Sequence, residues 1–247
     1  MEIDHLSYSS ISMYLACPES WRRKYIAKEP TVSSPALIFG SAIHNTVEQY
    51  VQVGGDLLSI WSEKWAGQME KEGGNVLWGM SSPEDSYNKG IQLLSDKGVI
   101  DTLKMIKPKS IEMKVELRVP GVPVPIIGYI DLITEDGTVC DFKTSSKSWT
   151  ATRARDEQQP IFYLSALSQA HEQVNWKFRH YVLTTLKTPK LDVFDTQRTP
   201  GEAFFLFKMI QEIWKGIEAE VFFPNTGGWK CSPAYCDFWS NCRGRYQ

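Results

Sequence analysis

Apolar side chains recur every three or four residues through most of the first hundred positions, which is the pattern of amphipathic helices. In the stretch from Ala36 to Val53, for example, Phe39, Ile43 and Val47 share one stripe. The spacing predicts four helices, at residues 7–28, 36–53, 56–72 and 84–106. A Gly- and Ser-rich stretch separates the last two helices, so we expect residues 54–106 to form a helical insertion.

From residue 111 onward, short segments rich in Ile, Val, Tyr and Phe predict strands. These strands are expected at residues 111–119, 125–134, 138–144, 178–185 and 191–195, with helices at 155–171 and 202–220. This order predicts an α/β fold in which a small mixed sheet is flanked by helices. Residues 222–247 carry three cysteines and a loop-like pattern, which indicates a Cys-rich tail.

The 247 residues are 42% apolar, which is enough for one sizeable core, and we expect a single domain over residues 1–247. The net charge of −2 neither indicates nor excludes a nucleic-acid partner, because binding depends on local patches. The sequence has no signal-peptide pattern and no apolar run of membrane-spanning length, so we expect a soluble intracellular protein with no membrane partner. In such a compartment the five cysteines should be thiols, metal ligands or catalysts rather than disulfides.

The segment GYIDLITEDGTVCDFKTSS, which begins at Gly128, places two carboxylates in otherwise apolar strands. Its Glu-Asp-Gly turn should pair the strands as a hairpin, with Asp131 and Asp141 on neighbouring strands and Lys143 on the same face as Asp141. Mg²⁺ takes hard oxygen ligands and usually one or two protein carboxylates, and the Phe142 carbonyl could add a further oxygen. Composition alone favours the simpler interpretation, a solvated Asp–Lys pair on a surface hairpin.

A second group of candidate ligands consists of Cys17, Cys231, Cys236 and Cys242. The last three read C-x4-C-x5-C. Four thiolates can hold a 4Fe-4S cluster or a zinc ion, and free thiols in a Trp-containing tail are the alternative. Cys140 neighbours Asp141 on a predicted strand, so it should point to the opposite face and lie in the core.

Five segments, taken in order, resemble the PD-(D/E)XK nuclease superfamily, and in particular its RecB-like branch. They are LSYSSISMYLACPESWRRKYI, FGSAIHNTVEQY, VELRVPGVPVPIIGYIDLI, DFKTS and QPIFY. That branch includes helicase-associated exonucleases, AddB-type nuclease domains, the iron–sulfur exonucleases of CRISPR spacer acquisition and many phage proteins. The chain departs from the usual Pro-Asp motif, because Asp131 follows Ile130, but the RecB-like branch commonly shows the G-x-x-D that is present here.

The resemblance implies a restriction-endonuclease-like core and a site for Mg²⁺ or Mn²⁺. The implied metal ligands are His44, Asp131, Asp141 and the backbone carbonyl of Phe142. The implied catalytic residues are Asp131, Asp141 and Lys143, with Glu116 as a supporting acid. Taken singly, His44 would be interpreted as a packed histidine and Glu116 as a residue on a strand surface.

The resemblance also implies that Gln159 and Tyr163, four residues apart on one helix face, contact DNA or steady the lysine. We expect Arg153 to help them guide the strand through phosphate contacts and base stacking. In the RecB-like branch one cysteine before the core and three after it hold a 4Fe-4S cluster, which implies that the tail packs with Cys17. The family pattern has two residues between the first two tail cysteines, where this chain has four, so zinc or no metal stay open.

Together these features predict a divalent-metal-dependent DNA nuclease, an exonuclease on single-stranded DNA or DNA ends with little sequence specificity. The alternatives are a nuclease-fold DNA-binding or scaffold subunit of a recombination or spacer-acquisition complex and, more weakly, a cluster-based redox protein. A helicase, recombinase or integrase partner would then lie on another chain. The expected setting is the cytoplasm of a bacterial or phage-infected cell.

Overall fold

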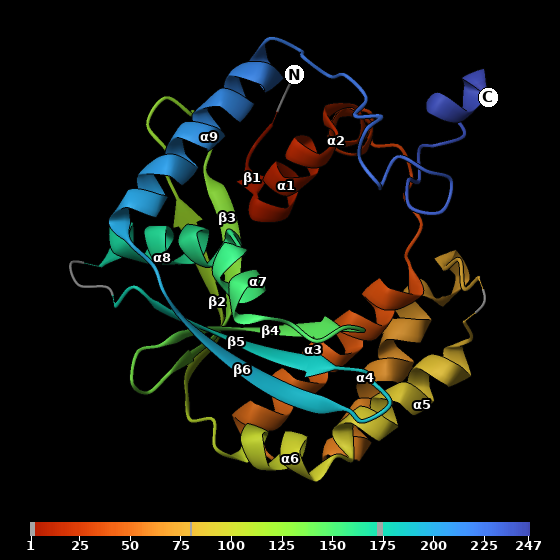
Figure 1. Ribbon diagram of the computed structural model, residues 1–247, viewed down its shortest axis with the longest axis vertical. Coiled ribbons are helices and arrows are strands. Elements are labelled where there is room, and N and C mark those ends of the chain that lie inside the picture. Colours follow the sequence, from red (N-terminus) through yellow and green to blue (C-terminus); the bar gives the residue numbers. More distant parts are fainter. Residues whose placement is uncertain (1–2, 80, 172–174) are drawn as a thin grey trace.

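The computed structural model describes residues 3–79, 81–171 and 175–247. Within them the chain forms a six-stranded mixed sheet with helices on both faces (Figure 1). The strands are β1 (Leu6–Ser7), β2 (Pro108–Leu117), β3 (Ile126–Thr134), β4 (Val139–Ser145), β5 (Lys177–Thr184) and β6 (Lys190–Gln197). The predicted fold class is confirmed, and each predicted strand lies within three residues of its expected bounds.

The strand β3 organises the sheet because both of its edges are used. β2 pairs antiparallel along one edge. The other edge is shared: β1 pairs parallel at Ile126 and Ile127, and β4 pairs antiparallel at Leu132 and Ile133. β4 then pairs parallel with β5, which pairs antiparallel with β6. Between the β1 and β4 pairings, this edge of β3 is therefore open, because no strand of the described residues pairs with it there.

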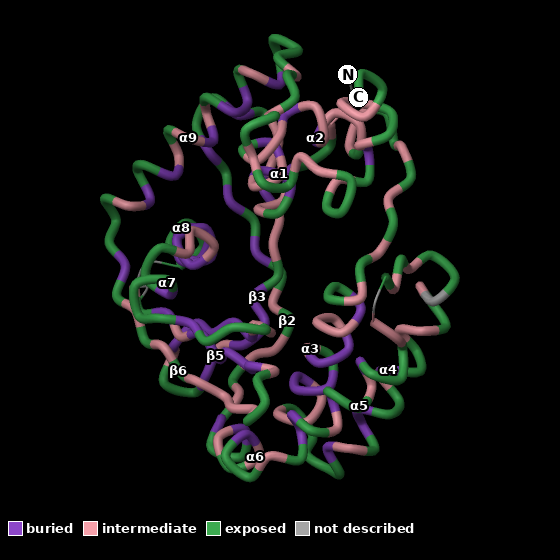
Figure 2. The backbone as a smooth tube through the Cα atoms, turned by 45° about the vertical axis from the view of Figure 1, so that its right-hand side comes forward, coloured by how far each residue is buried: buried purple, intermediate pink, exposed green. Residues whose placement is uncertain are grey.

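Four helices cover one face of the sheet: α1 (Tyr8–Ala16), α2 (Pro18–Tyr25), α8 (Gln159–Ala170) and α9 (Pro200–Glu218). Their buried side chains join those of β2 and β3 in one core cluster, which includes Trp21, Ile130, Phe162 and Leu206. Each such side chain stabilises the fold by roughly 1.5–3 kcal/mol through burial. Buried and exposed segments alternate along α9, as an amphipathic helix requires (Figure 2).

The opposite face carries α3 (Pro35–Val53), α4 (Leu57–Glu72), α5 (Pro83–Leu94) and α6 (Lys97–Lys104), with the short 3-10 helix η1 (Gly73–Asn75). Their core cluster includes Trp61, Leu93, Leu132 and Phe142, so these helices pack on β3 and β4. Cys140 belongs to the same cluster and is fully buried, as its position on the strand predicts. Ser34, Ser82 and Asp96 each accept a backbone N–H at the start of a helix, which satisfies one otherwise unpaired donor.

The helix predicted at residues 7–28 is two helices. The chain breaks at Cys17, whose φ of −164° and ψ of 103° are extended. Pro18 follows it, and a proline disfavours the helical conformation of the residue before it. The break turns α2 away from α1 and places the Cys17 side chain at the junction between the two helices.

Two other predicted helices are also divided. The segment 84–106 ends its first helix at Leu94 and restarts at Lys97, where Asp96 caps α6 by accepting the Val99 N–H at 3.0 Å. The segment 155–171 contains the last two residues of α7 (Ala151–Asp156) and then, after Glu157 and Gln158, the separate helix α8. In the segment 84–106 helical periodicity continues across the break because α5 and α6 pack on the same core.

The C-terminal tail follows α9 as turns, with the 3-10 helix η2 (Arg243–Tyr246) near its end. It lies against α2 (Figure 1). Glu19 donates its N–H to the Phe223 carbonyl at 3.3 Å, and Arg23 Nη2 donates to the Asn241 carbonyl at 3.0 Å. Among the helices of the described residues, none combines the length and apolarity that a membrane span requires.

Candidate active site

The candidate site lies where β3 and β4 separate. The two strands pair through Leu132 with Cys140 and through Ile133 with Val139. Beyond these pairs, Asp131 Oδ2 accepts the Phe142 N–H at 2.8 Å, so a side-chain carboxylate takes the place of a backbone acceptor. Asp131 and Asp141 are both buried and lie on adjacent strands, as the hairpin pattern predicts.

Helix α3 brings a histidine and a third carboxylate to this point. His44 Nε2 lies 2.7 Å from Asp131 Oδ2, and His44 Nδ1 lies 3.5 Å from Glu48 Oε1. Potential ligand atoms of these three residues all lie within 4.8 Å of one another, and no other group of three or more such residues meets this limit in the described part of the chain. Sequence reasoning missed Glu48, although its spacing of four residues from His44 puts both on one helix face.

The carboxylates change the protonation of this group. Burial alone would lower the pKa of His44, but the hydrogen bond and charge of Asp131, with the charge of Glu48, outweigh it and raise the pKa to about 9. Burial raises the pKa of Glu48 to about 7, although His44 opposes the shift. The protein therefore holds protons at this group well above the ordinary range of a carboxylate.

The residues present fit a divalent cation. Asp141 Oδ2 is buried and has no hydrogen-bond partner among the described residues, which is costly for a carboxylate oxygen unless a ligand satisfies it. Burial also raises the pKa of Asp141, against the effect of the neighbouring Lys143 charge. Clustered carboxylate oxygens and one imidazole are a donor set that Mg²⁺ and Mn²⁺ accept. A cation here would replace the protons that the carboxylates otherwise retain.

A chain of polar contacts links β4 to α8. Lys143 Nζ donates to Asp141 Oδ1 at 2.8 Å and to Gln159 Oε1 at 2.7 Å. Gln159 Nε2 in turn donates to the Tyr163 hydroxyl at 2.8 Å. Burial would lower the pKa of Lys143, but Asp141 outweighs it and raises the pKa, so the ammonium stays charged. The predicted shared faces of Asp141 with Lys143 and of Gln159 with Tyr163 are confirmed by these contacts.

The structure does not bring every predicted residue to the site. Glu116 is exposed on β2 and pairs with Arg118 Nη2 at 2.6 Å, so its contacts give no support to a role as supporting acid. Arg153 lies on α7 with its guanidinium 4.4 Å from the ring centroid of Trp149. The metal-binding role of the Phe142 carbonyl stays a prediction.

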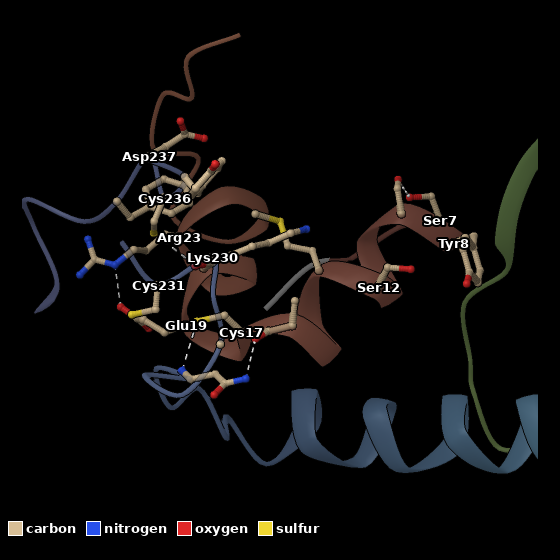
Figure 3. A pocket seen from close by; sticks show the side chains of 18 of the residues that line it. Ser7, Tyr8, Ser12, Cys17, Glu19, Arg23, Lys230, Cys231, Cys236 and Asp237 are labelled. Carbon is tan, nitrogen blue, oxygen red and sulfur yellow. Dashed lines mark hydrogen bonds and ion pairs between the residues drawn. The ribbon is translucent and has the colours of Figure 1, made fainter. Parts of the chain in front are cut away.

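Cys17 and the three tail cysteines line one cavity of about 1070 Å³, which Figure 3 shows from close by. The Asn225 N–H donates to Cys17 Sγ at 3.4 Å, and Cys236 Sγ lies 3.9 Å from Ser20 Oγ. Burial raises the pKa of Cys236, and the nearby sulfurs of Cys17 and Cys231 add to the shift. The tail thus brings its cysteines to the junction between α1 and α2. Cys140 lies in the core of the opposite face, where burial raises the pKa of its thiol to about 12.

The chain belongs to the PD-(D/E)XK nuclease superfamily, whose family model matches residues 5–243. That range contains every residue of the candidate site and all five cysteines. No curated protein matches the chain.

A solved structure shares the fold. A protein from Eubacterium rectale named "Putative exonuclease" is 10% identical with a TM-score of 0.63, over 94% of this chain and 86% of its own. The structure of SSO0001 is 16% identical with a TM-score of 0.39, over 95% of this chain and 92% of its own. At 10% identity the first similarity shows the fold alone.

Proposed function

We propose that this nuclease is a divalent-metal-dependent deoxyribonuclease, an exonuclease on single-stranded DNA or DNA ends. The observation that carries the proposal is the Lys143 ammonium, fixed between Asp141 and Gln159 beside a buried carboxylate oxygen for which the described residues offer no hydrogen-bond partner. A structural ion pair alone would not leave Asp141 Oδ2 unsatisfied, because an unpaired buried carboxylate oxygen costs free energy.

The residues that would hold the cation are His44, Asp131, Asp141, the Phe142 carbonyl and Glu48. Mg²⁺ or Mn²⁺ bound there would supply Lewis acidity at the phosphodiester and would lower the pKa of a bound water, so that more hydroxide is available at neutral pH. Asp131 also holds the β4 backbone through the Phe142 N–H, so the same carboxylate keeps the two strands at a fixed separation. This fixed framework orients the donor atoms before DNA arrives.

Lys143 has two tasks in this proposal. Its ammonium donates hydrogen bonds to the attacking water or to a phosphate oxygen, and its charge stabilises the negative charge that develops on phosphorus oxygens. Gln159 and Tyr163 hold the ammonium in place and exclude alternative rotamers through the 2.7 and 2.8 Å contacts. Because Lys143 stays protonated, it acts as a donor and as a positive charge rather than as a base.

We further propose that the cysteines hold a 4Fe-4S cluster. What supports this is that all four line one cavity although they come from two ends of the chain, Cys17 from the N-terminal helices and three from the tail. Thiolates are the ligands that iron–sulfur clusters take, and zinc is the alternative with the same donor set. A group bound there would join the two ends of the chain and contribute to folding.

The test is cleavage of end-labelled single-stranded and double-stranded DNA with Mg²⁺, Mn²⁺ or EDTA. We expect metal-dependent cutting that Asp141→Asn and Lys143→Met both lose. Arg118→Gln should retain it, because the hydrogen bonds of Arg118 go to Glu116 and Gln169, outside the site. Tight DNA binding without cutting on any substrate would instead support the scaffold alternative.

A further inference from the structure

The cavity at the cysteines does not end there. It extends along α1 to the open edge of β3, where Gly128 and Tyr129 line it together with Gln159 and Tyr163. Figure 3 shows this course, with Cys231 and Cys236 at one end and Tyr8 and Ser12 of α1 toward the strand at the other. One continuous hollow therefore joins the tail to the residues that hold Lys143.

Apart from the four cysteines, the charged side chains that line this cavity carry more positive than negative charge, although the whole chain has a net charge of −2. The cations are Arg23, Lys114, Lys230 and Arg243. Two carboxylates oppose them, Glu19 and Asp237. Glu19 pairs with Arg23 at 2.7 Å, which leaves Lys114, Lys230 and Arg243 against Asp237. Positive charge gathered in a hollow attracts a polyanion.

The same lining presents aromatic rings to solvent at both ends. Tyr129 on β3 is 56% exposed, and Trp229 and Tyr235 in the tail are 70% and 67% exposed. Each end combines a ring with a lysine. Lys114 is the register partner of Tyr129 across β2 and β3, and Lys230 Nζ lies 5.6 Å from the Trp229 ring centroid. A ring for a base beside a cation for a phosphate is the combination that binds unpaired nucleic acid.

We propose that this cavity is the path of an unpaired DNA strand, which runs from Trp229 in the cysteine-rich tail to Tyr129 and then to Lys143. The proposal rests on the proposed function and adds to it the binding residues and the reason for strand selection. In a duplex the base faces are stacked on one another and cannot stack on Tyr129 or Trp229. The tail is then one wall of the substrate path, and ordering of the tail by its cysteines controls DNA binding.

The experiment measures binding of a fluorescent single-stranded oligonucleotide and of its duplex in EDTA, with anaerobically purified protein. We expect Trp229→Ala and Tyr129→Ala each to weaken single-strand binding about 5- to 150-fold, the range of one lost base–aromatic stack. The matched control is Phe204→Ala, because Phe204 is 66% exposed on α9 and Lys208 Nζ lies 5.5 Å from its ring centroid, outside the cavity. Because Tyr129 lies outside the tail, the result for Tyr129→Ala can be interpreted even if a substitution in the tail prevents the tail from ordering.

Salt dependence gives a second readout. Each phosphate contact with a single strand contributes about 0.7 to the slope of log affinity against log salt concentration. Lys230→Gln should reduce the slope by about that amount, and Lys208→Gln should leave it unchanged. Equal slopes for the two variants, or equal losses for Trp229→Ala and Phe204→Ala, overturn the proposal.

The two proposals can fail separately. Cavity-dependent binding of single strands by a protein that never cuts DNA would retain the strand path and overturn the nuclease. Metal-dependent cutting with normal single-strand affinity in both Tyr129→Ala and Trp229→Ala would retain the nuclease and overturn the strand path. A duplex that binds as tightly as the single strand and is insensitive to these substitutions also overturns it.

Discussion

The ammonium of Lys143 lies 2.7 Å from Oε1 of Gln159, and this contact ties the central strand β4 to the first turn of α8. This contact joins the candidate metal site to the proposed path of the DNA strand. Lys143 faces the buried carboxylates, while Gln159 lines the cavity that leads to the tail. A side chain that touches both can align the bound strand with the residues that act on it.

Removal of the Gln159 amide should therefore slow cutting without weakening metal binding. For Gln159→Leu we expect the rate at saturating DNA to fall about 10- to 100-fold, because the ammonium loses one of its two acceptors and its position. Magnesium affinity, measured by calorimetry, should not change. The same-helix control is Gln169→Leu, because the Gln169 amide hydrogen-bonds the Arg118 backbone, away from Lys143. If Gln169→Leu lowered the cutting rate as much as Gln159→Leu, the cause would be a displacement of α8 rather than the loss of the contact with Lys143.

Glu48 should belong to the metal site. Glu48→Gln removes a charge 3.5 Å from His44 Nδ1, so we expect Mg²⁺ and Mn²⁺ affinity to weaken about 10- to 100-fold, whether Glu48 binds the ion or orients His44. Titration calorimetry on the DNA-free protein gives the affinity directly. Glu63→Gln on α4 is the control, since Glu63 is exposed and pairs with Lys64. Identical affinities in the two variants would remove Glu48 from the site.

Much of this site could be predicted because it depends on strand alternation. Asp131, Asp141 and Lys143 fall on one face once two strands and a turn are assigned, and the turn signal is local. Glu48 could have been predicted too, because the helix that carries His44 was expected and four residues is one turn.

Other features depend on packing between distant segments, which one sequence does not display. The strand β1 is two residues long and exists because Leu6 and Ser7 lie beside Ile126 and Ile127. No alternation can develop over two residues. Glu116 shows the converse: its acidic strand position fits the family pattern, yet the structure leaves it exposed beside Arg118. The break at Cys17, in contrast, was visible in the sequence as Pro18.

Metal binding should stabilise the protein more strongly as pH rises. In the metal-free state the pKa of Glu48 is raised from 4.5 to about 7, and that of His44 from 6.5 to about 9. The folded state therefore binds more protons than the unfolded state, and these two groups lower stability as pH rises through each interval. Mg²⁺ binds the deprotonated ligands, so the stabilisation that it adds grows as pH rises and these protons leave.

The measurement is the difference in Tm between a fixed free Mg²⁺ concentration and EDTA, from about pH 6 to about pH 9. Taking the difference cancels groups outside the site, such as buried His180, whose lowered pKa acts on both curves alike. We expect the difference to grow across this interval in the wild type and to flatten in His44→Gln. A difference that is constant or falls with pH would contradict the assigned ligands.

Gly128 should be needed for the close approach of α8 to β3. A Cβ at this position would lie 2.4 Å from Phe162 Cε1 and 3.2 Å from Tyr163 Cε1. Gly128→Ala should destabilise the protein by about 1–3 kcal/mol in urea unfolding, and it should slow cutting by displacing Tyr163. Gly67→Ala on α4 meets nothing within 4 Å and should be neutral or stabilising by up to about 1 kcal/mol. Equal stability of the two variants would contradict the tight packing at Gly128.

The cysteines should hold the tail to the N-terminal helices through a metal cluster. Protein purified without oxygen should be coloured and contain about four iron atoms and as many acid-labile sulfides per chain. Cys236→Ser should lose them, and trypsin should then cut the tail at Lys230 and Arg243 faster, because the cluster no longer orders residues that only a few hydrogen bonds hold to α2. Cys140→Ala is the control, since Cys140 is buried in the other core cluster and should keep the full iron content. A colourless protein with neither iron nor sulfide, and with a tail equally resistant in wild type and Cys236→Ser, would rule out the cluster; one zinc ion per chain in its place would assign the same four thiolates to zinc.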